Sequence, residues 1–269
     1  AFYYLFPGRI EIARKNLTLA FGDQLPLEEK KRIIRRSAQN FGRWFLDFLT
    51  FEGLSESEIS SRLEFAPESI RVLTESMESN RGVILLGTHF CHWELIGLRL
   101  GALQGIKGAV VAKKMHNPYL DQWINRIRTH TGNEIIYADE ANLKILRALR
   151  HGKAVGIVFD QDTSLSRGGV YTTFFGQGCV TTRAPATFSL ATGAPIISAW
   201  CLPRPTGGYE LFMERVSGFV PSGDREKDSQ ALTQLCNDTV ERYIRQNPEY
   251  YFWFHRRWKH RPEGCCPVY

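Results

Sequence analysis

A histidine and a glutamate five positions apart are the residues of this sequence best suited to acid–base chemistry. His89 and Glu94 lie in the segment T-H-F-C-H-W-E, directly after the apolar run 82–87. A neutral imidazole can accept the proton of an attacking hydroxyl, and a carboxylate on its other nitrogen stabilises the imidazolium that forms. The pair is therefore a candidate for general-base catalysis, with His89 as the base and Glu94 as its orienting partner.

The spacing restricts how these two side chains can meet. Five residues of ideal helix rotate by about 140°, so two helical residues at this spacing do not share a face. The run 82–87 is typical of a buried strand. We therefore expect His89 in the turn after a strand and Glu94 at the start of the next helix. Ligands of open α/β sheets bind at such strand ends.

Other interpretations of the same segment remain open from the sequence. A polar strand end followed by an acidic helix start would look the same without being catalytic. His89, His92 and Glu94 could bind a metal ion, although no second cluster offers a further ligand. Cys91 could be a nucleophile, but in an extended chain it alternates away from His89. His92 is better explained as a packing or hydrogen-bonding neighbour.

The rest of the sequence predicts the elements that would position this pair. Short apolar runs alternate with helix candidates, which indicates an α/β protein with a largely parallel or mixed central sheet flanked by helices. The segment 209–216 alternates and predicts an antiparallel edge strand. The expected strands are 82–87, 108–112, 154–159 and 194–200, and the expected helices are 93–104, 118–131, 141–151, 183–192 and 224–246.

The first 80 residues predict a helical extension to an α/β catalytic core at 81–269, within a single domain 1–269. A helix is expected at 28–51, with a crowded basic first half, and a shorter polar one at 56–80. The basic face of the first helix would be solvated or would lie on an anionic membrane. The apolar start A-F-Y-Y-L-F is too short to span a bilayer. It suits either the remainder of a membrane anchor or a buried turn.

Composition excludes disorder and a disulfide scaffold. Hydrophobic residues make up 43% of the 269 residues and charged residues 23%. The six cysteines contain no C-x-x-C pair, which favours reduced thiols. The net charge of +6 suits a partner that carries phosphates, without choosing among an anionic membrane, a phosphorylated lipid and nucleic acid.

Six segments in order along the chain resemble the bacterial lipid A late acyltransferases, which are lauroyl and myristoyl transferases within the H-x4-D/E glycerolipid acyltransferase superfamily. The set is far more specific than the histidine and glutamate alone. The segments are N-L-T-L-A-F-G at 16–22, T-H-F-C-H-W-E at 88–94, N-P-Y-L at 117–120, F-D-Q-D at 159–162, G-G-V-Y-T-T-F-F-G at 168–176 and P-E-Y-Y-F-W-F-H-R-R-W-K at 248–259.

This resemblance implies an O-acyltransferase that moves a fatty acyl chain from a thioester, with acyl carrier protein as donor, to a hydroxyl of a lipid A precursor. The implied location is the cytoplasmic face of the bacterial inner membrane, held by an N-terminal anchor. It implies His89 as general base, Glu94 as its partner, and Arg126 in catalysis or phosphate binding. Metal, cofactor and nucleic acid play no part in the implied reaction.

Further positions are candidates for binding substrate. They are Arg128, Asp160, Asp162, Lys113, Phe174 and Phe175. The two aspartates could instead cap a turn after strand 154–159. The segment 168–176 is expected to close over the acyl chain. The basic, aromatic segment 255–261 suits an anionic membrane interface, lipid phosphates or a solvated tail, and it would also suit nucleic acid, although no nucleic-acid motif accompanies it.

Three other functions remain open from the sequence. The acceptor could be a lysophospholipid or a mannosylated lipid. The protein could bind anionic lipid without catalysis, or it could hydrolyse thioesters.

Overall fold

A seven-stranded sheet forms the centre of the computed structural model, which describes residues 2–269, with side chains from Tyr3 onward. The strand order is β1-β9-β8-β2-β5-β3-β4. The strands are β1 Leu63–Phe65, β2 Val83–Gly87, β3 Gly108–Ala112, β4 Glu134–Tyr137, β5 Ala154–Val158, β8 Ile196–Pro203 and β9 Tyr209–Arg215.

All neighbouring strands run parallel except β8 and β9, so the predicted α/β class and largely parallel sheet are confirmed. The antiparallel direction predicted for 209–216 is also confirmed. Its expected position at the edge is wrong, because β1 pairs with the outer side of β9. β1 lies in the stretch expected to be only helical, and its three residues are too few for a periodic pattern to be recognised.

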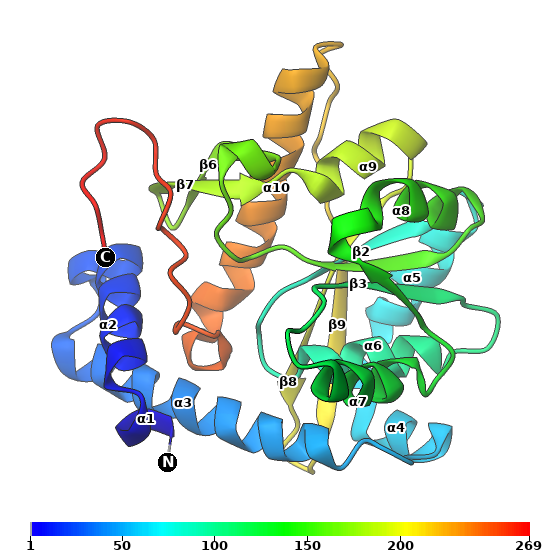
Figure 1. Cartoon of the computed structure of the whole chain (residues 1–269), viewed down its shortest axis with the longest axis horizontal. Coiled ribbons are helices and arrows are strands. Elements are labelled where there is room, and N and C mark those ends of the chain that lie inside the picture. The colour runs from blue at the N-terminus through cyan, green and yellow to red at the C-terminus, as the bar shows by residue number, and fades with distance from the viewer. Residues whose placement is uncertain (1) are drawn as a thin grey trace.

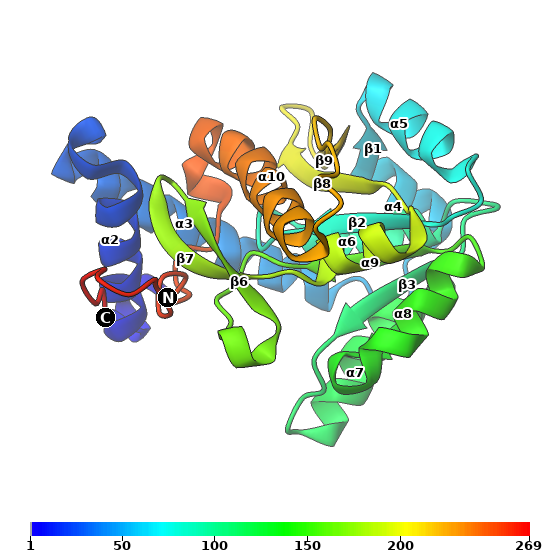
Figure 2. The same cartoon turned by 90° about the horizontal axis from the view of Figure 1, so that it is seen from above.

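Helices cover both faces of the sheet (Figures 1 and 2). Alternate residues of β2 point to opposite sides. Ile84 and Leu86 pack in the core beside α8, α9 and α10, whereas Leu85 packs in the core beside α4, α5 and α6. The helices are α1 Phe2–Leu5, α2 Pro7–Phe21, α3 Leu27–Leu49, α4 Glu56–Arg62, α5 Pro67–Met77, α6 Trp93–Gly101, α7 Pro118–Thr129, α8 Ala141–Arg150, α9 Ala184–Thr192 and α10 Arg225–Gln246.

The long helix α3 is tied to the C-terminal segment that follows α10. The Ser37 hydroxyl donates to the Tyr251 carbonyl at 2.6 Å, and the Asn40 amide donates to the Glu249 carbonyl at 3.0 Å. This contact joins parts of the chain that are far apart in sequence and holds α3 across one end of the sheet (Figure 1). None of the helices in residues 2–269 is long and apolar enough to span a bilayer.

The segment 168–176, expected to close over the acyl chain, supplies the first strand and the turn of a hairpin. β6 (Gly169–Phe174) pairs antiparallel with β7 (Gln177–Thr182) around a turn in which Phe175 and Gly176 have φ values of 54° and 69°. Two positive φ values are characteristic of a tight two-residue hairpin turn. Phe174 and Phe175 are buried among Phe21, Trp253 and Trp258. Their expected role in holding an acyl chain does not fit this position, because core rings already surround both side chains.

The basic C-terminal segment also turns partly inward. Arg257 is only 2% exposed, and its guanidinium donates to the Val180 carbonyl and the Thr181 hydroxyl. Trp258 is buried beside it. The expectation of a solvated tail is therefore wrong for this part of 255–261, since its arginine and tryptophan anchor the hairpin.

Candidate active site

The register of two parallel strands brings His89 and Asp160 together. Gly87 at the end of β2 is aligned with Val158 at the end of β5, and each polar residue follows two positions later. His89 Nδ1 lies 2.9 Å from Asp160 Oδ1. The backbone N–H of His89 also faces both oxygens of the same carboxylate, at 3.2 Å each. Asp160 is buried, so the carboxylate is held in one position against the ring.

Residues 89–91 are fixed from behind by the C-terminal segment. The Phe252 N–H donates to the His89 carbonyl at 2.9 Å, and the Cys91 N–H donates to the Tyr250 carbonyl at 2.8 Å. Cys91 has a φ of 47°, a left-handed conformation that non-glycine residues rarely adopt. The turn therefore presents the His89 ring from a rigid support, as a positioned base requires.

Opposing effects act on the pKa of His89, and the balance raises it. Burial lowers the pKa, but the charge and hydrogen bond of Asp160 together outweigh burial. The charge of Glu94 raises it further, and that of Arg128 opposes this. Burial of Asp160 would raise the pKa of its carboxyl, yet the charge and hydrogen bonds of His89 keep it below the ordinary value. The pair therefore favours an ionised Asp160 whose negative charge supports a proton on His89.

Glu94 lies where its spacing predicted, but it does not contact the histidine ring. His89 is in the turn after β2, and Glu94 is in the first turn of α6, so the predicted strand–turn–helix arrangement is confirmed. The Glu94 carboxylate makes a paired contact with Arg128, whose Nε and Nη2 lie 3.0 and 2.5 Å from its two oxygens. The expectation that Glu94 orients His89 is corrected, because Asp160 occupies that position.

An apolar cavity of about 540 Å³ opens beside His89. Its size falls in the range of roughly 300–1,000 Å³ typical of small-molecule sites. The cavity lies between α6, α7 and the face of the sheet formed by β2, β3 and β5. Polar lining residues are His89, Glu94, Lys113, Arg128, Asn133 and Gln161, and most of the other lining residues are aliphatic, among them Leu85, Ile96, Leu98, Leu100, Val110 and Ile157.

Gln161 is a site residue that the sequence did not single out. Its amide nitrogen lies 3.2 Å from His89 Nε2, the nitrogen that does not face Asp160. It also lines the apolar cavity. In F-D-Q-D the glutamine stands between two aspartates. Side chains alternate in direction along an extended chain, so the position of Gln161 after β5 predicts that its side chain points away from those of the two aspartates.

Other predicted site residues lie away from the cavity. Arg126 is largely exposed and pairs with Glu52 at 2.9 Å, on the outer side of α7. Arg128, two positions later, is the arginine that enters the cavity. Asp162 contacts His260, whose Nδ1 lies 2.7 Å from the carboxylate.

His92 is buried among aromatic rings and does not join His89 and Glu94. Its ring stacks on Phe51 at 4.8 Å, and burial lowers its pKa to about 3. Within residues 2–269, no group of three histidine, cysteine, aspartate or glutamate side chains is arranged to hold a metal ion. The predicted packing role of His92 is confirmed.

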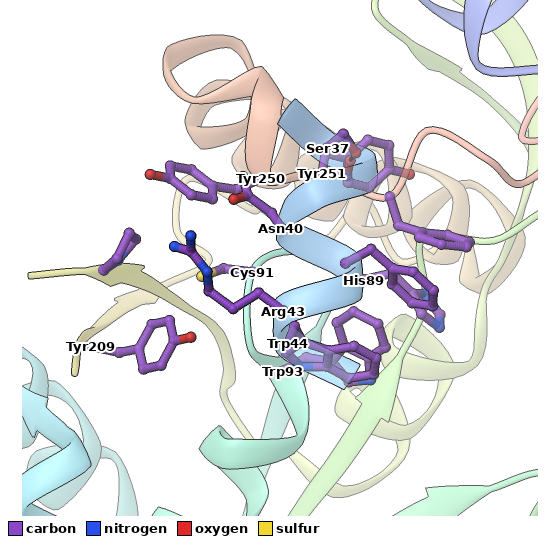
Figure 3. A pocket seen from close by; sticks show the side chains of 13 residues that line it. Ser37, Asn40, Arg43, Trp44, His89, Cys91, Trp93, Tyr209, Tyr250 and Tyr251 are labelled. Atoms are coloured by element: carbon purple, nitrogen blue, oxygen red, sulfur yellow. Dashed lines mark hydrogen bonds between the residues drawn. The ribbon is translucent and has the colours of Figure 1, made fainter. Parts of the chain in front are cut away.

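A second, shallower pocket opens on another side of His89, and Figure 3 shows it. α3 and the C-terminal segment form two of its walls. It holds about 40 Å³ and is lined by Ser37, Asn40, Phe41, Arg43, Trp44, His89, Cys91, Trp93, Pro203, Tyr209, Tyr250, Tyr251 and Phe252. His89 is therefore shared by an apolar cavity and a mixed polar and aromatic pocket.

Comparison with known proteins identifies the family. The sequence model described as bacterial lipid A biosynthesis acyltransferase matches residues 1–260, nearly the whole chain. The chain belongs to this family. It is similar to the lipid A biosynthesis palmitoleoyltransferase of Escherichia coli (strain K12), with 28% identity over 97% of this chain and 82% of that protein.

Other members of this acyltransferase family are also similar. The lipid A biosynthesis lauroyltransferase of Escherichia coli (strain K12) is 26% identical over 95% of this chain and 81% of its own length. The phosphatidylinositol mannoside acyltransferase of Mycobacterium tuberculosis (strain ATCC 25618 / H37Rv) is 22% identical over 95% of this chain and 79% of that protein. The enzyme class of the family is acyltransferase.

Proposed function

We propose that the protein transfers a fatty acyl chain from a thioester to a hydroxyl of a lipid A precursor, with His89 as the general base. One observation carries this proposal: a histidine backed by a buried carboxylate lies at the mouth of an apolar cavity. The cavity suits an acyl chain, and the histidine suits activation of a hydroxyl.

The reaction can be written for the residues present. The acceptor hydroxyl gives its proton to His89 Nε2 while its oxygen attacks the thioester carbonyl. The tetrahedral intermediate collapses, the carbon–sulfur bond breaks, and the proton passes from the imidazolium to the departing thiolate. Asp160 stabilises the imidazolium on the Nδ1 side. Because the Gln161 amide lies 3.2 Å from Nε2, it must move aside, or share that position, when the hydroxyl arrives.

The Glu94–Arg128 pair has a proposed supporting role at the same mouth. Both side chains are largely buried and line the cavity, so the carboxylate fixes where the guanidinium points. A guanidinium presents donors in a rigid fork that suits oxygen ligands. We place Arg128 beside the reacting thioester, where its charge would stabilise the oxyanion. Arg126 would then have no part in the chemistry.

Acyl carrier protein is the proposed donor. Carrier proteins of this kind are acidic, and Lys113 stands exposed at the cavity mouth within a chain of net charge +6. Charge complementarity of this kind speeds association. The acceptor is a lipid, so the reaction would take place at the membrane surface, with the inner membrane as the proposed location.

Similarity to lipid A transferases at 26–28% identity supports the lipid A acceptor over the mannosylated lipid, whose transferases are 22% identical. Mass spectrometry of lipid A from cells with and without this protein tests the proposal. We expect one further acyl chain on lipid A when the protein is present. An added acyl chain found only on a mannosylated lipid, with lipid A unchanged, would assign the second acceptor instead.

A further inference from the structure

One arginine of α3 lacks a partner at the shallow pocket, and a second arginine lies on the same face of the helix. Arg36 and Arg43 follow one face of the helix with Asn40, at spacings of four and three residues. Among the residues that the structure describes, Arg43 has no hydrogen bond or ion pair, whereas the charge of Arg36 acts on Glu29. Burial and the charges of Cys91 and Glu249 raise the pKa of Tyr250, and the charges of Arg36 and Arg43 lower it, so a carboxylate lies near the same ring as the two cations.

Arg43 lines the pocket that it shares with His89. In Figure 3 its guanidinium is directed towards the end of the pocket at Tyr209 and Tyr250, while the His89 ring lies at the other end. The Arg43 cation and the His89 ring therefore lie at opposite ends of the shallow pocket. An anionic group bound to Arg43 would leave another part of the same ligand next to His89.

The pocket walls are tied together, so the backbone that carries Arg43 is fixed relative to His89. Asn40 bonds to the Glu249 carbonyl and Ser37 to the Tyr251 carbonyl, which joins α3 to the C-terminal segment. The same segment bonds to the backbone of His89 through the Phe252 N–H. The position of Arg43 relative to His89 therefore does not depend on a flexible loop.

The remaining lining suits a sugar. Trp44 and Trp93 stack with ring centroids 3.9 Å apart, and Trp93 also meets the His89 ring edge-on at 4.9 Å. Trp44 covers one face of Trp93, so the C–H face of a sugar ring can pack only on the side of Trp93 that the stack leaves uncovered. The pocket, at about 40 Å³, is far smaller than the apolar cavity, so a phosphorylated sugar bound there would lie partly outside it.

From these contacts we infer that this pocket binds the sugar–phosphate part of the acceptor, with Arg43 holding a phosphate and the Trp93 face supporting the sugar that carries the reacting hydroxyl. This inference rests on the proposed acyltransferase function. It assigns the two openings at His89 to different substrates: the apolar cavity to the acyl chain and the shallow pocket to the acceptor. A guanidinium suits phosphate because its planar donors can bind two oxygens together.

Steady-state transfer to two acceptors tests the inference. The acceptors are a phosphorylated lipid A precursor and the same precursor after enzymatic removal of its phosphates. For Arg43→Gln we expect the acceptor KM to rise roughly tenfold or more with the phosphorylated lipid, as for a lost charge-assisted hydrogen bond. We expect kcat to change little, and the KM for the dephosphorylated lipid to stay the same.

Two further variants control for folding and charge. Arg43→Lys should recover part of the affinity, since it restores the charge without the fork. Arg35→Gln should behave like wild type, because Arg35 lies over Tyr3 at 5.9 Å and outside the pocket. Equal losses of Arg43→Gln on both acceptors, or a wild-type enzyme that does not distinguish them, would overturn the inference.

A binding measurement separates this inference from the proposed reaction. The Trp44–Trp93 pair should report glucosamine phosphate through a saturable change in fluorescence, and Arg43→Gln should abolish that change. Saturable binding without any acyl transfer would reject the proposed function and leave the anion site standing. Transfer without any effect of Arg43→Gln on binding or KM would reject the site and leave the function standing.

Discussion

Two histidine–aspartate pairs follow strand β5, and they differ in surroundings more than in geometry. His89 Nδ1 lies 2.9 Å from Asp160, and His260 Nδ1 lies 2.7 Å from Asp162. In both pairs the backbone N–H of the histidine also contacts the same carboxylate. The aspartates are 3% and 7% exposed, so both are held in the protein interior.

The difference between the pairs is what the second ring nitrogen meets. His89 faces an apolar cavity and a shallow pocket, whereas His260 lines neither and is 41% exposed. The pair Asp162–His260 joins the end of the sheet to the C-terminal segment. A histidine–aspartate contact is therefore equally compatible with catalysis and with structure, and the open space beside the ring decides between them.

The largest expected effect comes from removing each histidine in turn. His89→Ala should reduce acyl transfer by about 10³-fold, since general-base catalysis contributes roughly 10²–10⁴-fold. His260→Ala should retain activity within a fewfold of wild type. Transfer of radiolabelled acyl chain from carrier protein measures both rates, and circular dichroism checks the fold. Near-normal turnover by His89→Ala would show that the His89–Asp160 pair is not the catalytic one of the two.

The next effect separates the aspartates through pH dependence. The proposed mechanism requires neutral His89, and the pKa of His89 is raised above its ordinary 6.5, so the rate should rise with pH through a midpoint above 6.5. Asp160→Asn removes the charge that raises the pKa and leaves burial, which lowers it. The low-pH limb of kcat/KM should therefore move to lower pH, while the maximum falls about 100-fold.

Asp162→Asn provides the matched control for this profile. It should leave both the limb and the maximum close to those of wild type, because Asp162 does not contact His89. If both substitutions moved the limb equally, the two carboxylates would act as one electrostatic unit, and the distinction drawn here between the pairs would fail.

A smaller effect tests the cavity that distinguishes the two pairs. Gly156 of β5 lies in register with Leu85 and Val110 and lines the cavity. A Cβ at this position would meet only the Ala109 carbonyl, at 3.8 Å, so a side chain there would project into space. Gly156→Val should lower kcat/KM roughly tenfold for long acyl donors and spare short ones, as expected for lost methylene contacts.

A donor series of increasing chain length measures this shift, and Gly156→Ala should give an intermediate result. Uniform loss across all chain lengths would indicate a general distortion of the site. Such a loss would mean that the acyl chain does not lie against Gly156 in the apolar cavity.

The smallest effect is on stability. His260→Ala should lower the free energy of unfolding by about 1 kcal/mol, since its ring is partly exposed and such contacts are screened by solvent. Urea denaturation measures this change. A loss several times larger would mean that the C-terminal segment depends on this one contact.

The fold was predictable where periodicity and length were sufficient. The strands of buried apolar type and the helices between them were found in order, because parallel strands covered on both faces are apolar throughout. β4 was missed because its four residues, E-I-I-Y, begin with an exposed charge and follow a helix closely. β1 was missed for its short length. The hairpin β6–β7 could not be placed, because its burial comes from aromatic residues supplied by distant segments.

The site was predictable in its histidine but not in its carboxylate. Sequence proximity favoured Glu94, five positions from His89, over Asp160, which is far away in the chain. The deciding information was strand order, since β2 and β5 are neighbours although β3 and β4 separate them in sequence. Once that order is known, the two polar residues that follow these strands must meet.

The backbone pairing of residues 89–91 with 250–252 has a consequence for biosynthesis. The ribosome makes the segment carrying His89 early and the segment that closes behind it late. Pairing between such distant parts of the chain is slow compared with local folding. The nascent protein thus holds His89 in an unfinished turn until residues 250–252 have been made and can pair with it.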